Sequence, residues 1–98
     1  MFYIGCHLSK KKGMLIMAEA AASIGAKAIQ FFTRNPRGGS VKPFDEADAN
    51  ALNALMEEHH FAPILAHAPY TLNACAADAS IRDFAIRTMT DELARLSH

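Results

Sequence analysis

The hydrophobic residues of this chain fall into three short runs, and a longer segment with helical periodicity follows each run. The runs are residues 2–6, 28–33 and 62–66. Their short length and their aromatic and branched side chains favour buried strands over helices. Successive strands separated by a helix are expected to run parallel, joined by right-handed crossovers. The pattern therefore predicts an α/β fold made of three strand–helix units.

The first two helices have recognisable ends. Residues 14–24 are rich in alanine, leucine and methionine and stop at Gly25, which suits the left-handed conformation common after a helix. Asp45 is expected to begin the second helix by accepting a hydrogen bond from the backbone N–H of Asp48. The spacing i, i+3, i+4 and i+7 predicts one apolar face for the second helix, made of Leu52, Leu55, Met56 and His59.

The third helix is predicted from residue 80 onward. Ser80 and Asp83 form an S-x-x-D pattern of the capping-box type, and a loop over residues 68–79 precedes it. An apolar stripe is expected to face the core: Ile81, Phe84, Ala85, Thr88, Met89, Leu93 and Leu96. The charged side chains are expected to face water: Arg82, Asp91, Glu92 and Arg95.

Length and composition limit the class of protein. The 98 residues predict a single small domain, residues 1–98, with one core. No run of about 18 apolar residues is present to span a membrane, and no basic leader precedes an apolar stretch. Cys6 and Cys75 are too few for a disulfide scaffold and too far apart for a zinc ribbon, so we expect two buried, reduced thiols. These features predict a cytoplasmic protein without a membrane partner.

Charge is distributed unevenly although the net charge is zero. Up to Lys42 there are seven basic residues against one acidic residue, Glu19. From Pro43 onward there are three arginines against nine acidic residues. The basic half can form an edge that faces a polyanion, and the alternative is a set of ordinary solvated loops and helix faces.

Candidate chemistry gathers where the predicted strands end. In parallel α/β folds, functional groups collect where strands end and helices begin, whether the sheet is open or closed into a barrel. This rule selects His7 after the first strand, residues 33–37 after the second and residues 67–73 after the third. We expect these positions to lie side by side on one face.

The histidines have different prospects. His67 at a strand exit suits a metal ligand or a general acid/base, and the alternative is a histidine held by backbone hydrogen bonds. His7 holds the equivalent place on the first strand and carries the same two interpretations. His59 and His60 lie near a helix C-terminus, where a positive charge is stabilised by the helix dipole, so a structural role is expected. Tyr70 suits stacking on a base or insertion into a duplex, or it covers the sheet edge.

The loop after the second strand suits phosphate. It contains Arg34, Asn35 and Arg37 together with Gly38 and Gly39. Guanidinium groups pair with phosphate oxygens through two donors, and glycine allows close approach of the backbone. The alternative is a solvated loop.

Three segments together carry a family resemblance. They are Y-I-G-C-H-L-S near the start, F-F-T-R-N-P-R-G-G after the second strand and I-L-A-H-A-P-Y-T-L-N around the third. In order and spacing they resemble the first three strand-end motifs of the endonuclease IV family, the zinc-dependent apurinic/apyrimidinic endonucleases. That family is part of the xylose-isomerase-like barrels. The resemblance runs from Met1 to about Leu96, and it implies a (β/α)8 TIM barrel of which this chain supplies the first three units.

The resemblance also implies an activity and roles for residues. It implies DNA repair, in which three zinc ions assist hydrolysis of the phosphodiester 5′ to an abasic site in double-stranded DNA, by an enzyme that is monomeric at full length. His67 matches a zinc ligand, and Arg37 and Tyr70 match loop residues that enter the DNA. Other motif positions match the same face with looser roles: His7, Ser9, Arg34 and Asn35.

The chain departs from the family in length. It ends after three of the eight units of a barrel of roughly 250 residues, before the strands that carry the other zinc ligands. We therefore expect an incomplete barrel that does not assemble the metal cluster alone. Two alternatives stay open. One is a sugar isomerase or epimerase, which would not need paired arginines in the second loop; the other is a small non-catalytic α/β domain that covers its sheet edges by oligomerising.

Overall fold

The structure is a computed structural model that describes residues 2–38 and 41–98. The predicted loop glycine Gly39 lies outside the described residues. The elements, in order, are β1 (Gly5–His7), α1 (Met14–Ser23), β2 (Ala28–Phe32), α2 (Glu46–Glu58), β3 (Leu65–His67) and α3 (Ala79–Leu96). They divide into two compact units: the first holds Met1–Phe32 and Asp45–His67, and the second holds Thr33–Phe44 and Ala68–His98.

The sheet of the first unit confirms the predicted parallel topology. Its strand order is β1-β2-β3, and both pairs are parallel. Gly5 lies opposite Ala28 in the first pair, and Phe32 lies opposite His67 in the second. The outer strands are shorter than predicted and shifted toward the chain's C-terminus, so both end on a histidine.

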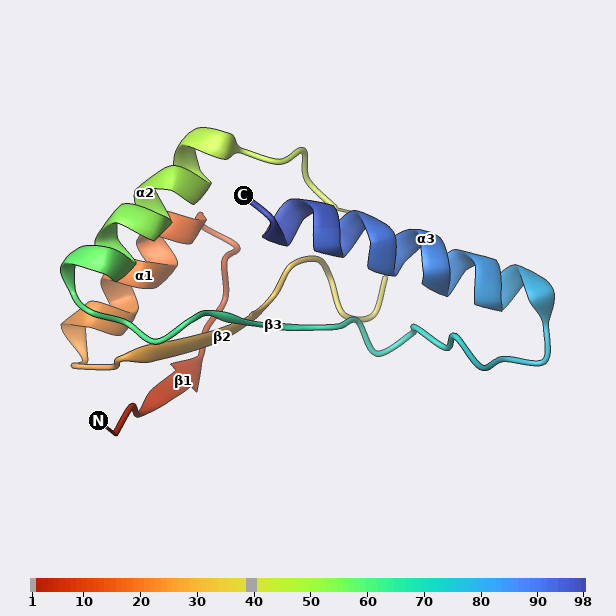
Figure 1. Cartoon of the computed structure of the whole chain (residues 1–98), viewed down its shortest axis with the longest axis horizontal. Helices are drawn as coiled ribbons and strands as arrows, with labels where there is room; N and C mark the ends of the chain where they lie inside the picture. The colour runs from red at the N-terminus through yellow and green to blue at the C-terminus, as the bar shows by residue number, and fades with distance from the viewer. Residues whose placement is uncertain (1, 39–40) are drawn as a thin grey trace. The chain divides into compact units, whose positions relative to one another are not determined.

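Alternation along β2 separates the two faces of this sheet. Ile29 and Phe31 are 2% exposed and belong to the core with Met17 and Leu52 from the two helices. Figure 1 shows α1 and α2 side by side on one side of the strands. Because side chains alternate along a strand, Gln30 and its neighbours on β1 and β3 face away from the helices. The helices therefore leave the second face of the sheet to other side chains.

Both helices of the first unit end in the same backbone motif. After α1, Gly25 has a φ of 74°, its N–H bonds the Ala22 carbonyl, and the next N–H bonds the Ala21 carbonyl. This is a Schellman ending, and it confirms Gly25 as the predicted cap. After α2 the equivalent left-handed position is His60, with a φ of 56° and the same two hydrogen bonds. His60 thus has a structural place in the fold.

Asp48 links the beginnings of the two helices. Asp45 caps α2 as predicted, since its side chain accepts from the Asp48 N–H at 3.0 Å. The side chain of Asp48 then accepts from the backbone N–H groups of Met14 at 2.7 Å and Leu15 at 3.0 Å. Gly13, the residue before α1, has no side chain for this purpose. The first two N–H groups of α1 are therefore satisfied by a carboxylate from α2.

The second unit contains α3, and four predictions about it and its loop were wrong in whole or in part. The helix is capped by Asp78, which accepts from the Ser80 N–H at 2.8 Å, so Ser80 is not the cap. Glu92, expected in water, is 6% exposed, because it pairs with an arginine. Cys75, expected to be buried, is exposed. Of the expected apolar stripe, Ala85 and Thr88 are buried, whereas several larger members are exposed: Ile81, Met89, Leu93 and Leu96.

Of the helices in the described part of the chain, none has the length and apolar character needed to cross a membrane.

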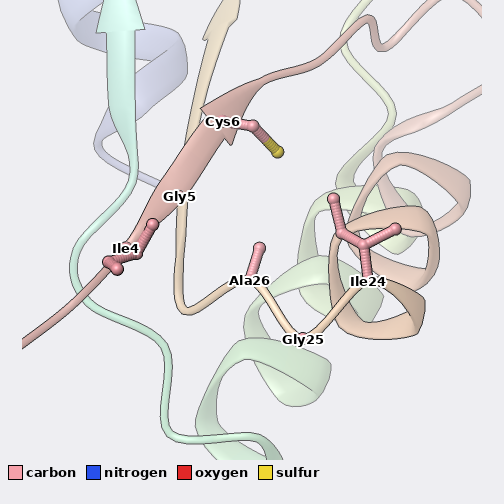
Figure 2. Close-up of a pocket in the computed structure, with 6 residues that line it drawn as sticks. All are labelled: Ile4, Gly5, Cys6, Ile24, Gly25 and Ala26. Carbon is pink, nitrogen blue, oxygen red and sulfur yellow. The ribbon is translucent and has the colours of Figure 1, made fainter.

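A shallow apolar pocket lies at the amino end of β1 in the first unit. Its volume is about 280 Å³, and Figure 2 shows Cys6 and Ala26 directed into the space beside the end of α1. The full lining is Ile4, Gly5, Cys6, Ile24, Gly25 and Ala26. In parallel α/β proteins this end of the strands serves stability and the opposite end carries chemistry. The pocket is therefore part of the packing, away from the strand ends that carry the histidines.

We predict that Asp48→Ala lowers the free energy of unfolding by about 1–2 kcal/mol, because it removes the acceptor for two N–H groups at the start of α1. Urea unfolding followed by far-UV circular dichroism measures this. Glu57→Ala, on an exposed position of the same helix, is the matched control and should change stability by less than about 0.5 kcal/mol. Equal effects of the two substitutions would contradict the role of Asp48.

Candidate functional site

The face of the sheet opposite the helices carries two histidines and a ring between them. His7 ends β1 and His67 ends β3. The Phe32 ring, at the end of β2, lies 4.8 Å from each imidazole, measured between ring centroids. Gln30 contributes a side-chain amide nitrogen 3.1 Å from His7 Nδ1. The structure thus confirms that the first and third strand ends meet on one face.

This face does not hold a complete metal site. Throughout residues 2–38 and 41–98, no group of three or more histidine, cysteine, aspartate or glutamate side chains is arranged to hold a metal ion. A zinc site needs three or four such ligands. Ser9, the other motif residue after β1, accepts a hydrogen bond from the Lys11 N–H at 3.2 Å and serves a local turn. The described residues therefore do not fit a zinc centre by themselves.

The second unit brings two predicted DNA-facing loops together. The Tyr70 N–H donates to the Pro36 carbonyl at 2.9 Å, which ties the loop after β3 to the loop after β2. Within the second loop, Asn35 Oδ1 accepts from the Arg37 N–H at 3.0 Å. The side chains of Arg37 and Tyr70 are exposed, Tyr70 at 63%. A guanidinium and an aromatic ring are thus presented on loops that share a backbone hydrogen bond.

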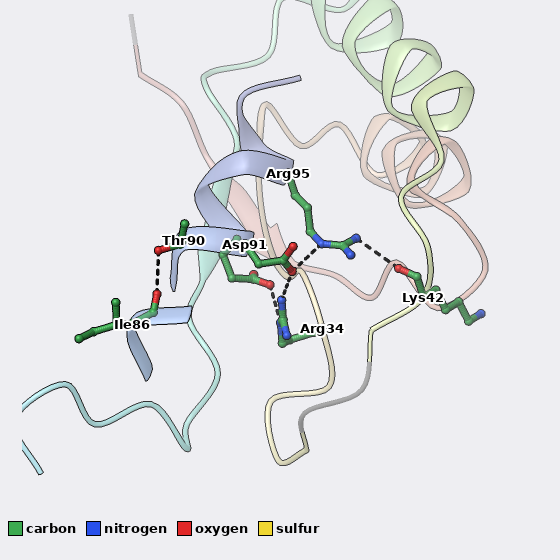
Figure 3. Close-up of polar contacts among 7 residues, drawn as sticks. Arg34, Lys42, Ile86, Thr90, Asp91 and Arg95 are labelled. Carbon is green, nitrogen blue, oxygen red and sulfur yellow. Dashed lines mark hydrogen bonds and ion pairs between the residues drawn. The ribbon is translucent and has the colours of Figure 1, made fainter. Parts of the chain in front are cut away.

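Arg34, in contrast, is turned toward α3. Its Nε donates to Glu92 at 2.5 Å, and its Nη2 donates to Asp91 (Figure 3). The Arg34 and Glu92 side chains are each 7% exposed. Desolvation works to lower the pKa of Arg34, but the hydrogen bonds and charges of Glu92 and Asp91 raise it above its ordinary value. This placement favours a role in holding the loop over direct contact with phosphate.

A second arginine extends the same network. Arg95 Nε donates to Asp91 at 2.9 Å, and Arg95 Nη1 donates to the Lys42 carbonyl at 3.2 Å, as Figure 3 shows. The hydrogen bond from Arg95, opposed by desolvation and supported by Arg34, holds the pKa of Asp91 below its ordinary value. Helix α3 therefore contacts the loop after β2 near both ends of that loop, at Arg34 and at Lys42.

Sequence reasoning missed four members of these arrangements. Gln30 and Phe32 lie on the face of the sheet that carries the histidines. The alternation along residues 28–33 could have shown that they share one face, because they are two residues apart on the same strand. Asp91 and Glu92 hold Arg34, and no local pattern marks a pairing across 58 residues in the chain. The second pair becomes visible only in three dimensions.

Parallel strands with crossover helices and polar strand ends define a class, the α/β proteins whose chemistry lies at the carboxyl ends of the sheet. Within that class, the xylose isomerase-like TIM barrel family matches residues 18–98. The chain belongs to this family.

The relatives are named for one activity. The chain is 53% identical over 98 residues to the protein named Probable endonuclease 4 of Clostridium beijerinckii, and 54% identical to that of Alkaliphilus oremlandii. Each match covers 100% of this chain and 35% of the relative. The crystal structure of endonuclease IV from Thermus thermophilus is similar with a TM-score of 0.88 and 28% identity, over 98% of this chain and 36% of that one. The chain thus spans about a third of the length of its relatives.

We predict that acid removes the contribution of Asp91 to stability. A carboxyl group whose pKa is lowered on folding contributes stability above its unfolded pKa, about 3.9, and that contribution is lost as pH falls through the folded value. Asp91→Asn should therefore be less stable than the parent chain at pH 7, and the difference should shrink below about pH 4.

Urea midpoints at pH 7, 5 and 3 measure this difference. Asp83→Asn, at an exposed position of the same helix, is the control. A difference for Asp91→Asn that persists undiminished at pH 3 would show that its charge is not involved.

Proposed function

We propose that these residues serve DNA repair, as part of an enzyme that hydrolyses the DNA backbone 5′ to an abasic site. The observation that carries the proposal is the placement of His7, Phe32 and His67 at the carboxyl ends of three parallel strands, on the face away from the helices. The relatives named endonuclease 4 match the whole chain at 53–54% identity, which supports the choice of nucleic acid over a sugar.

The proposed role of His67 is that of one zinc ligand. An imidazole at a strand end is a suitable ligand, and the ring of Phe32 beside it limits the directions in which it can turn. The remaining ligands of a three-zinc centre would come from strands beyond the three described here. In this proposal the activity belongs to the complete barrel, which acts as a monomer in the cytoplasm.

The second unit supplies the proposed contacts to DNA. Arg37 offers a guanidinium that can pair with phosphate, and Asn35 fixes the turn that presents it. Tyr70 offers an exposed ring on the neighbouring loop. A nucleotide that lacks its base costs little to extrude from the duplex, so an inserted side chain can select abasic sites by shape without reading base edges.

We predict that the 98-residue chain alone neither binds zinc stoichiometrically nor cleaves abasic DNA. The reason is that the described residues hold no group of three ligands. Metal analysis after dialysis against zinc, and incubation with a duplex containing a tetrahydrofuran abasic analogue, measure the two properties. Stoichiometric zinc or robust cleavage would contradict the proposal that the chain needs further strands.

A chimera provides the positive arm of the same experiment. Residues 1–98 are joined to the part of the Clostridium beijerinckii relative that follows the matched region. This chimera should retain zinc and cleave the abasic duplex on the 5′ side of the lesion. Turnover of ketoses without cleavage of DNA would refute the proposed function and favour a sugar isomerase or epimerase.

We further predict that His67→Ala in the chimera lowers zinc affinity and cleavage by more than about 100-fold, since even the loss of residues that only orient a ligand costs about 10–100-fold. His59→Ala is the matched control, because His59 is exposed beyond the end of α2, and it should leave both properties unchanged. Far-UV circular dichroism checks that the two variants fold alike. Normal zinc content in His67→Ala would exclude His67 as a ligand.

A further inference from the structure

The loop after β2 is attached to α3 by an ion-pair network in which Arg34 and Glu92 are buried and Asp91 is half-exposed. Arg34 is the second residue after β2, and its guanidinium is bound by Glu92 and Asp91 one turn before the end of α3. Its side chain is 7% exposed, as is that of Glu92. Two opposite charges so desolvated interact more strongly than a surface pair, and removing one partner leaves the other uncompensated. The bond is therefore expected to fix the path of the chain at Arg34.

This fixed point continues into both proposed DNA-binding loops. Directly after Arg34, Asn35 accepts the Arg37 N–H through its side chain and the Gly38 N–H, at 3.3 Å, through its carbonyl. The Pro36 carbonyl accepts the Tyr70 N–H at 2.9 Å. A short chain of hydrogen bonds thus connects α3, through Arg34 and residues 35–38, to the segment that carries Tyr70.

The exposure of the three candidate side chains divides their roles. Arg37 and Tyr70 are exposed and can meet a ligand. Arg34 already donates from two of its nitrogens to carboxylates, and a phosphate would have to compete with two fixed negative charges for the remaining donors. Coulomb repulsion between phosphate and these carboxylates disfavours that arrangement.

We propose that Arg34 is a positioning residue, which acts through its ion pair with Glu92 to hold the loops of Arg37 and Tyr70 in the geometry that meets abasic DNA. The inference rests on the proposed function. It goes further by assigning to Glu92 on α3 a part in DNA binding without any contact with DNA. The two arginines of the second loop thus have different roles: Arg37 contacts the phosphate backbone, and Arg34 holds the loop in position.

The effect of Glu92→Gln has opposite signs in the two possible roles of Arg34. If Arg34 only positions the loop, loss of the Glu92 charge frees the loop and weakens binding of the chimera to a tetrahydrofuran duplex by about tenfold. If Arg34 contacts phosphate, loss of a nearby negative charge leaves binding unchanged or strengthens it. Fluorescence anisotropy with a labelled duplex measures the affinity.

The salt dependence separates the roles a second time. Each lost phosphate contact lowers the slope of log affinity against log salt concentration by about one. Arg37→Gln, the matched control, should show this reduced slope. Arg34→Gln should weaken binding with an unchanged slope. The double variant, Arg34→Gln with Glu92→Gln, should bind no more weakly than either single variant, because each single substitution already removes the same ion pair. A reduced slope for Arg34→Gln would overturn the proposal.

Two further measurements test the proposal even if a single variant misfolds or if the chimera does not bind DNA. Arg34→Met with Glu92→Met replaces both buried charges by apolar side chains, which is often neutral for stability; it should show the weaker affinity with the unchanged slope. Without DNA, hydrogen exchange of the Tyr70 amide should accelerate about tenfold in Glu92→Gln. The Leu8 amide, which bonds the Gln30 carbonyl at 2.9 Å in the first unit, is the internal control.

The outcomes distinguish the two proposals. If the parent chimera neither binds nor cleaves abasic DNA, the proposed function fails, and the exchange rate of Tyr70 still decides whether the ion pair holds the loops. If the chimera binds DNA but Tyr70 exchange and affinity are unaffected in Glu92→Gln, the positioning role is refuted and the proposed function stands.

Discussion

The close approach of β1 to β2 at Gly5 is the constraint on which the histidine face depends. A Cβ atom at position 5 would lie 2.0 Å from the Ala28 carbonyl oxygen, so only glycine fits opposite Ala28. This pairing sets the register that places His7 opposite Gln30. A slip of one residue would move His7 to the face covered by the helices, because side chains alternate along a strand. The absence of a side chain at Gly5 therefore determines which face of the sheet carries the imidazole of His7.

The elements that sequence predicted well are those fixed by local chemistry. Gly25 ends α1 because only a few residue types tolerate its left-handed backbone, and Asp45 begins α2 because its carboxylate reaches an N–H three residues on. The parallel order of the strands followed from the helices between them. Each of these signals lies within a few residues of the feature it specifies.

The predictions that failed concern residues with two candidate roles, or residues whose partner lies far away in the sequence. Asp78 and Ser80 are both residue types that can cap a helix. The Asp78 carboxylate accepts both the N–H and the hydroxyl of Ser80, so Asp78 is the cap and Ser80 lies in the first turn of the helix. Glu92 looked like a solvent-facing residue because its partner Arg34 lies 58 positions away in the chain. The roles of His67, Arg37 and Tyr70 came from the family resemblance, since a single histidine or arginine has no signature of its own. They stay predictions.

The uneven distribution of charge has a partly internal explanation. The basic half and the acidic half of the chain meet in the ion pairs of Arg34 with Asp91 and Glu92. Lys27 donates to the His59 carbonyl at the end of α2, where the helix dipole is negative. Part of the positive charge is therefore used to hold the fold, and the charge that remains for a polyanion is smaller than composition suggests. Arg37, which is exposed, belongs to that remainder.

The exposed apolar residues and the edge strands of the first unit fit a sheet that is part of a larger one. Parallel sheets are normally covered on both faces, yet Leu65, which lies opposite Gln30, is 59% exposed. Phe2 and Ile4, which precede β1, are also exposed, at 85% and 66%. In the described part of the chain, β1 and β3 each pair only with β2. Such edges and apolar positions fit a larger closed sheet, in agreement with relatives about three times as long. In a closed barrel the carboxyl ends of the strands meet around one opening, so His67 would lie where side chains from further strands converge.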